Sequence, residues 1–227
     1  MGKDKLKRFA EVETFNNVIQ PDIKNLDSNH ETKGFWHIKF GNSNPIILEL
    51  GCGKGEYTVG LAKKFPNINF IGIDIKGSRI WRGAKTCIEE NIQNVFFLRS
   101  KVDFINHFFD KNEVSEIWLT FSDPQPKKPR KRLTSPLFID RYKKILKKEG
   151  VIHLKTDSDL LYEYTLDEIS SKNYEIINQC NDVHGFIKNN LSQKTQDILS
   201  IKTFYESIWI NDGKKIKYVC FSGIHNV

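Results

Sequence analysis

The amino-acid sequence predicts an α/β fold, built on a mostly parallel sheet with helices on both faces. Short apolar runs recur along the chain and stop at glycine or an acidic residue, as buried parallel strands do. Between these runs, apolar residues return at spacings of three and four, which is typical of one face of a helix. The 227 residues are 39% hydrophobic and 28% charged, a composition of folded domains rather than of disordered chains.

Seven strands are expected, at residues 46–50, 70–74, 95–98, 117–121, 151–154, 174–180 and 217–222. The last two are expected to form a closing pair, the last of them as an edge or antiparallel strand. Helices are expected at residues 58–65, 80–88, 135–146 and 162–169. The third of these opens with Ser135 as its cap and Pro136 as its first residue. This alternation indicates a parallel sheet whose ligands bind beyond the carboxyl ends of the strands.

The chain is expected to divide into a lead-in and one domain. Residues 1–45 have little regular periodicity, and we interpret them as an N-terminal basic arm and lead-in. A short ordered element is expected around residues 30–39. Residues 46–227 carry the strand and helix patterns and are interpreted as the domain.

The positive charge is concentrated in one segment. The chain has a formal net charge of +7, and residues 123–148 hold ten Lys/Arg against two Asp, a net of +8. The rest of the chain therefore has a net charge of −1. Such a patch favours a polyanionic partner, the alternative being a solvated, lysine-rich helix face.

Several function classes are disfavoured by composition. No apolar run approaches the roughly 18–20 residues of a membrane span, and the basic start lacks the apolar core of a signal peptide. The four cysteines are far apart, and neither they nor the six histidines show the spacing of a metal site. We therefore expect a cytoplasmic protein with no membrane segment and no metal.

The first predicted strand runs into a glycine-rich loop, Glu49–Gly55. A dinucleotide fingerprint would require its last glycine at the position of Glu56, and Lys54 is out of frame for a phosphate-binding P-loop. The remaining common pattern, E/D-x-G-x-G-x-G, is the loop of S-adenosylmethionine (AdoMet)-dependent methyltransferases. Asp74 ends the second strand, where its carboxylate could accept hydrogen bonds from both ribose hydroxyls.

The fourth predicted strand runs into the most specific segment of the chain, Phe121–Thr134. Asp123 follows the buried strand, and two prolines stiffen the loop after it. A carboxylate in this position would face a transferable methyl group. Five cations that suit phosphate contacts then follow within six positions: Lys127, Lys128, Arg130, Lys131 and Arg132.

Together these motifs resemble the bacterial tRNA (guanine-N7-)-methyltransferase family, which modifies a guanosine in the variable loop of tRNA. The matching segments are Lys5–Glu11, Glu49–Gly55, Asp74, Phe121–Leu133, Thr156-Asp157 and Thr203–Glu206. The resemblance implies a Rossmann-like class I AdoMet methyltransferase fold for residues 46–227, with AdoMet as cofactor and tRNA as partner. Two positions depart from the family pattern. Gln125 replaces the usual Trp, and Lys101 stands where an adenine-binding acid is often found, with Asp103 two residues on.

The resemblance also assigns site residues. Asp123 would be catalytic. The cofactor would be bound by Glu49, Gly51, Gly53, Gly55, Asp74 and Asp123. The target guanosine would be surrounded by Lys127, Asp157, Thr203, Tyr205 and Glu206, and tRNA phosphates would be bound by Lys128, Arg130, Lys131 and Arg132. The plainer alternatives are that Asp157 caps the next helix and that Glu206 lies on a surface strand.

The chemistry agrees with this assignment. Guanine N7 has an in-plane lone pair and no proton, so the enzyme mainly positions the base and offsets the charge that it acquires. A 5-methylcytosine enzyme would need a cysteine in the fourth-strand loop, and an amino-group methyltransferase would need an aromatic residue where Pro126 stands. Two alternatives stay open: an AdoMet methyltransferase with another substrate, and a non-catalytic RNA-binding protein on the same scaffold.

Overall fold

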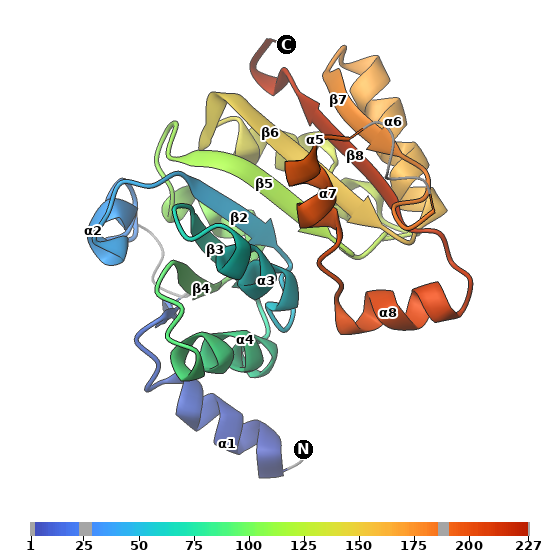
Figure 1. Ribbon diagram of the computed structural model, residues 1–227. Helices are drawn as coiled ribbons and strands as arrows, with labels where there is room; N and C mark the ends of the chain where they lie inside the picture. The colour runs from blue at the N-terminus through green and yellow to red at the C-terminus, as the bar shows by residue number, and fades with distance from the viewer. Residues whose placement is uncertain (1–2, 23–28, 186–190, 227) are drawn as a thin grey trace.

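The computed structural model describes residues 3–22, 29–185 and 191–226. Their strands form one sheet (Figure 1). The strands are β1 (Val18–Ile19), β2 (Ile46–Leu50), β3 (Asn69–Asp74), β4 (Val95–Arg99), β5 (Val114–Thr120), β6 (Leu146–Thr156), β7 (Glu175–Cys180) and β8 (Lys217–Ser222). The α-helices are α1 (Lys3–Val12), α2 (Trp36–Phe40), α3 (Glu56–Lys64), α4 (Gly77–Glu89), α5 (Pro136–Tyr142), α6 (Asp159–Ser171), α7 (Gln193–Leu199) and α8 (Phe204–Asn211).

The sheet is doubly wound. Its strand order is β1-β4-β3-β2-β5-β6-β8-β7, in which β8 runs antiparallel to both of its neighbours and the other pairs are parallel. The chain builds outward from β2 to β4 and then returns to the other side of β2 with β5. The order therefore reverses between β2 and β5, and a ligand crevice is expected at their carboxyl ends.

Each face of the sheet has its own apolar core. Side chains of α2, α5 and α6 pack on one face, and side chains of α3, α4 and α7 pack on the other. Because both faces are covered, the central strands carry almost continuous apolar runs, and all five residues of β2 are buried. The predicted fold class is confirmed.

The predicted strand count is corrected by β1. All seven expected strands are present in the part of the chain that the structure describes, and the two residues of β1 add an eighth there at the edge, where Val18 pairs with Phe97 of β4. So short a strand has no periodicity to detect. The lead-in also contains α1, and α2 overlaps the ordered element expected around residues 30–39.

The helix expected over residues 135–146 ends earlier. It stops at Tyr142, and Leu146 already begins β6, paired with Val114 of β5. The apolar residues that suggested a longer helix are buried as expected, but the last of them belongs to the sheet. Lys147 and Lys148 consequently lie on a strand and not on the helix face that was the alternative interpretation of this charge.

Candidate functional site

The carboxyl ends of β2, β3, β5 and β6 bring the predicted site residues to one edge of the sheet. Glu49 lies in β2 and Asp74 ends β3, while Asp123 follows β5 and Asp157 follows β6. The α7–α8 segment returns to the same region, because Thr203 and Tyr205 line one pocket with Gly51. Residues far apart in the sequence thus share one site at the reversal of strand order.

The glycine-rich loop is held in a conformation that favours glycine. Gly51, Gly53 and Gly55 have φ angles of +79°, +57° and +72°. A Cβ on Gly51 or Gly53 would meet nothing within 4 Å, whereas one on Gly55 would lie 2.5 Å from the Phe97 ring. The first two glycines therefore leave the backbone open to a ligand, and the third allows α3 to pack against the sheet.

Asp74 ties the ends of β2 and β3 together. Its Oδ2 accepts a hydrogen bond from the Gly53 amide at 3.0 Å, and its Oδ1 accepts one from the Lys76 amide at 2.7 Å. Each carboxylate oxygen can accept a further hydrogen bond, so this geometry is compatible with a ribose diol. The predicted cofactor role of Asp74 remains a prediction.

Glu49 is a buried carboxylate beneath the loop. It accepts hydrogen bonds from the Thr58 amide at 2.8 Å and from the hydroxyls of Thr58 and Thr120. Burial nevertheless raises the pKa of Glu49 to about 7, and the negative charge of Asp74 adds to this effect. Glu49 can therefore exchange a proton near neutral pH and would prefer to ionise beside a cation.

Two pockets meet at the glycine-rich loop. The smaller, about 140 Å³, is lined by Glu49, Gly51, Cys52, Gly53, Lys54, Glu56, Arg79, Thr120, Phe121, Thr203, Tyr205 and Trp209. The larger, about 670 Å³, is lined by Gly51, Ile73, Asp74, Ile75, Ser100, Lys101, Val102, Asp103, Phe104, Gln125, Lys131, Leu133, Phe138 and Arg141. Lys101 and Asp103 both line the larger pocket, and Asp103 faces Arg141 at 3.7 Å.

The loop after β5 is strained on both sides of Asp123. Phe121 and Gln125 have φ angles of +51° and +44°, which are rare for residues with a side chain and are concentrated at functional sites. Phe121 lines the smaller pocket and Gln125 the larger one. Asp123 itself is exposed and accepts a hydrogen bond from the Gln125 amide at 2.9 Å. Asp123 thus lies in the loop between a residue of the smaller pocket and a residue of the larger one, and its carboxylate is oriented by the Gln125 amide.

The five cations after this loop divide into two groups. Lys127, Lys128, Arg130 and Lys131 are exposed, as phosphate contacts require. Arg132 is buried, and its Nε donates to the Pro124 carbonyl at 2.9 Å while its guanidinium lies 4.4 Å above the Tyr164 ring. Arg132 therefore anchors the loop that carries Asp123. A run of cations in a sequence does not distinguish these two tasks.

A buried ion pair holds the α7–α8 segment against the sheet. Lys155 of β6 lies 2.8 Å from Glu206 of α8, and both side chains are 0% exposed. Lys155 also donates to the carbonyls of Leu199 and Ile201 at 3.0 and 2.9 Å. Lys155 is not among the residues predicted for the site, although a lysine within an apolar strand is an unusual signal.

Glu206 is a helix residue. Its amide bonds the Thr203 hydroxyl and its carboxylate accepts from the Thr203 amide, a reciprocal cap that begins α8. The surface-strand alternative for Glu206 is therefore wrong. Burial alone would raise the pKa of Glu206, but hydrogen bonds with His184 and Lys155 and the charge of Lys155 hold it below its ordinary value.

Asp157 does not cap the following helix. Ser158 does so, since its hydroxyl accepts from the Leu161 amide at 3.2 Å. Asp157 instead pairs with Lys214 at 3.2 Å and lines a third pocket, about 970 Å³, together with Pro124. Asp157 thus lies beside the loop of Asp123.

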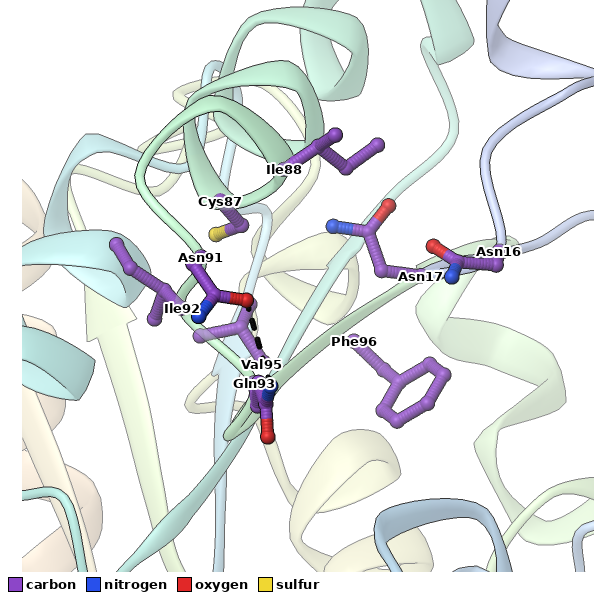
Figure 2. Close-up of a pocket in the computed structure, with 9 residues that line it drawn as sticks. All are labelled: Asn16, Asn17, Cys87, Ile88, Asn91, Ile92, Gln93, Val95 and Phe96. Atoms are coloured by element: carbon purple, nitrogen blue, oxygen red, sulfur yellow. Dashed lines mark hydrogen bonds between the residues drawn. The ribbon is translucent and has the colours of Figure 1, made fainter.

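An amide-lined pocket of about 330 Å³ lies away from this edge (Figure 2). Asn91 and Gln93 line it, joined by a hydrogen bond of 3.3 Å, where α4 leads into β4. That position is the amino end of the strand, so the pocket is separate from the predicted site. Among the described residues, the side chains also form no His, Cys, Asp or Glu cluster that could hold a metal ion, and no helix there could span a membrane.

Comparisons with known proteins support a methyltransferase fold. The Methyltransf_4 family model, which describes methyltransferases, matches residues 43–219. The solved "Structure of an Antibiotic Related Methyltransferase" aligns with a TM-score of 0.61 at 18% identity, over 88% of this chain and 98% of that chain, which supports the fold alone.

Curated relatives match at much higher identity. A tRNA (guanine-N(7)-)-methyltransferase of Christiangramia forsetii is 50% identical over 224 residues, covering 97% of this chain and 98% of that protein. One of Bacteroides thetaiotaomicron is 48% identical over 223 residues, covering 97% of this chain and 86% of that protein. The chain therefore belongs to the tRNA (guanine-N(7)-)-methyltransferase family.

Proposed function

We propose that this protein transfers the methyl group of AdoMet to N7 of a guanosine in tRNA, giving 7-methylguanosine. One observation carries the proposal: the glycine-rich loop after β2 and Asp123 after β5 lie at the same edge of the sheet, and the exposed cations Lys127, Lys128, Arg130 and Lys131 directly follow Asp123. The names of the curated relatives support it. Such an enzyme would act in the cytoplasm, with tRNA as its partner.

The two pockets at the glycine-rich loop fit a ligand with a nucleoside end and an amino-acid end. Asp74 would bind the ribose in the larger pocket, and the open backbone at Gly51 and Gly53 would allow close approach. Gly55 would contribute indirectly, because its lack of a side chain allows α3 to pack against the sheet. Glu49 lines the smaller pocket, where its carboxylate would favour a cationic group. Bound there, AdoMet would supply an electrophilic methyl group.

The residues of this chain would then position the guanine base against the methyl group. Methyl transfer to N7 would leave the electron pair of the broken carbon–sulfur bond on sulfur, and these residues would hold the two reactants in line. N7 carries no proton, so neither a general base nor a metal is invoked. The alkylated base gains a positive charge, which the carboxylates of Asp123 and Asp157 would offset. Exposed Tyr205 would contact the base with Thr203 and Lys127, and Glu206 would act from behind by holding this segment.

Phosphate contacts fall to the exposed part of the basic run. Arg132 is buried, whereas Lys128, Arg130 and Lys131 are exposed. These three side chains can therefore approach a phosphate backbone. We assign Arg132 instead to positioning the Asp123 loop through Pro124. Arg132 thus has a different role from the other cations of the run, although the sequence predicted the same phosphate-binding role for Lys128, Arg130, Lys131 and Arg132.

Nucleoside analysis tests the function directly. Incubated with AdoMet and unmodified tRNA, the purified protein should produce 7-methylguanosine, which mass spectrometry identifies after digestion of the tRNA. Methylation of another base would contradict the proposed chemistry, and absence of any methylation would remove the activity.

Replacing Asp123 tests the catalytic assignment. Asp123→Asn keeps an oxygen that can accept from the Gln125 amide but removes the charge, so kcat should fall about 100-fold or more while tRNA affinity stays within about twofold. Asp140→Asn, at an exposed position of α5, is the matched control and should leave kcat unchanged. Unaltered turnover in Asp123→Asn would exclude Asp123 from the reaction.

The raised pKa of Glu49 predicts a pH dependence of AdoMet binding. Below a pH of about 7 the buried carboxyl holds its proton, and a cationic ligand must displace that proton to bind. Affinity should therefore fall up to about tenfold per pH unit as the pH drops from 7 to 5.5, measured by calorimetry. Glu49→Gln should bind more weakly with a flat profile. A slope as steep in Glu49→Gln would assign the titration to another group.

A further inference from the structure

We propose that exposed cations of α1, of the N-cap of α4 and of the first half of α4 form a second tRNA-binding surface, on the side of the site opposite α8. This α1–α4 surface comprises Lys5, Lys7, Arg8, Lys76, Arg79 and Arg82, all exposed. The partner follows from the proposed function, on which this inference rests. Its chemistry, a phosphate backbone, follows from the side chains themselves.

The basic arm is docked on the domain. Glu11 of α1 accepts a hydrogen bond from the Trp81 indole at 2.7 Å and pairs with Lys85 at 2.6 Å, both on α4. Val12, the last residue of α1, is buried, and the Arg8 guanidinium lies 4.6 Å above the Trp81 ring. Figure 1 shows α1 lying next to α4 below the sheet. The cations of the arm therefore have a defined place relative to the site.

The charge of the two helices has one dominant sign. Together α1 and α4 contain seven Lys/Arg and three Asp/Glu. Glu11 is one of the three acids, and its carboxylate is engaged by Trp81 and Lys85. Glu89 is another, at the far end of α4 from the glycine-rich loop. Seven cations against three acids give the two helices a net charge of +4.

The α1–α4 surface is continuous with the mouth of the site. Arg79 lines the smaller pocket with Gly53 and Tyr205, and exposed Lys54 lies 4.9 Å from the Phe204 ring of α8. Lys131 lines the larger pocket, which meets the smaller one at Gly51. A polyanion whose target base enters between the pockets could therefore contact cations from both sides.

The charge count along the sequence does not show this second group of cations. Outside residues 123–148 the chain has a net charge of −1, which suggests a single basic patch. In the fold, residues 5–8 lie next to residues 76–82, because α1 packs on α4 and Arg8 lies over Trp81, so cations far apart in the sequence are brought together. Cations on both sides of a pocket would hold an extended RNA backbone across it better than one patch could.

Binding of tRNA tests the proposal. The triple variant Lys5→Gln, Lys7→Gln, Arg82→Gln should bind unmodified tRNA at least about tenfold more weakly near 0.1 M salt, and its log K against log salt slope should be shallower by about one to three units. The control triple Lys111→Gln, Lys144→Gln, Lys148→Gln removes equal charge at exposed positions near the amino ends of β5 and β6. It should bind tRNA within about twofold of the parent.

A second variant separates docking from charge. Glu11→Ala makes the protein more positive, so charge alone would give tighter tRNA binding. We expect weaker binding, by about threefold or more, because α1 loses its contacts with Trp81 and Lys85. AdoMet affinity, measured on each variant, verifies that the site is folded.

The outcomes distinguish this inference from the proposed function. Equal losses in both triple variants, or tighter binding by Glu11→Ala, would overturn the α1–α4 surface while formation of 7-methylguanosine stands. If tRNA bound weakly and an acidic peptide displaced it as effectively as tRNA itself does, the surface would suit an acidic protein partner. That result would overturn the RNA assignment. A parent protein that binds tRNA without methylating it would overturn the function alone.

Discussion

The site depends on one buried ion pair, between Lys155 and Glu206. A lone charge in a protein interior is strongly unfavourable, and the two side chains stabilise each other there, with His184 as a further partner of Glu206 and two carbonyls as further partners of Lys155. The α7–α8 segment also packs closely on α3. A Cβ added at Gly60 of α3 would lie 2.6 Å from the Ile201 side chain, so there is no room for a side chain at position 60. Glu56 adds a hydrogen bond to the Phe204 amide at 2.9 Å. The start of α8 is thereby held beside the glycine-rich loop.

The same edge is fixed from the other side by the loop after β5. Its two positive φ angles, at Phe121 and Gln125, are unfavourable by themselves and persist because the surroundings hold them. Arg132 contributes by binding the Pro124 carbonyl. A reaction that needs no proton transfer at the nucleophile requires this kind of rigidity, since orientation and electrostatics supply most of the catalysis.

The sequence predicted the parts of this structure that depend on local pattern. Apolar runs and glycines identified the central strands and the edge where Glu49, Asp74 and Asp123 meet. The missed features depend on contacts between distant residues: the burial of Arg132 needs Tyr164, and that of Glu206 needs Lys155. The length of α5 was overestimated because buried residues of a turn and a strand continued its helical spacing. β1 was too short to show a period, and the position of the basic arm beside the cations of α4 depends on tertiary contacts such as that of Glu11 with Trp81.

The central claim is that the ion pair positions the substrate-facing segment, and a double-mutant cycle tests it most directly. kcat/KM for tRNA methylation would be measured for Lys155→Met, Glu206→Met and the double variant, with AdoMet affinity verifying the fold. Removing one partner leaves the other charge buried, so the effects should be strongly non-additive, with a coupling of about 1–3 kcal/mol. Additive losses, within about 0.3 kcal/mol, would show that the two residues act independently and would contradict the account.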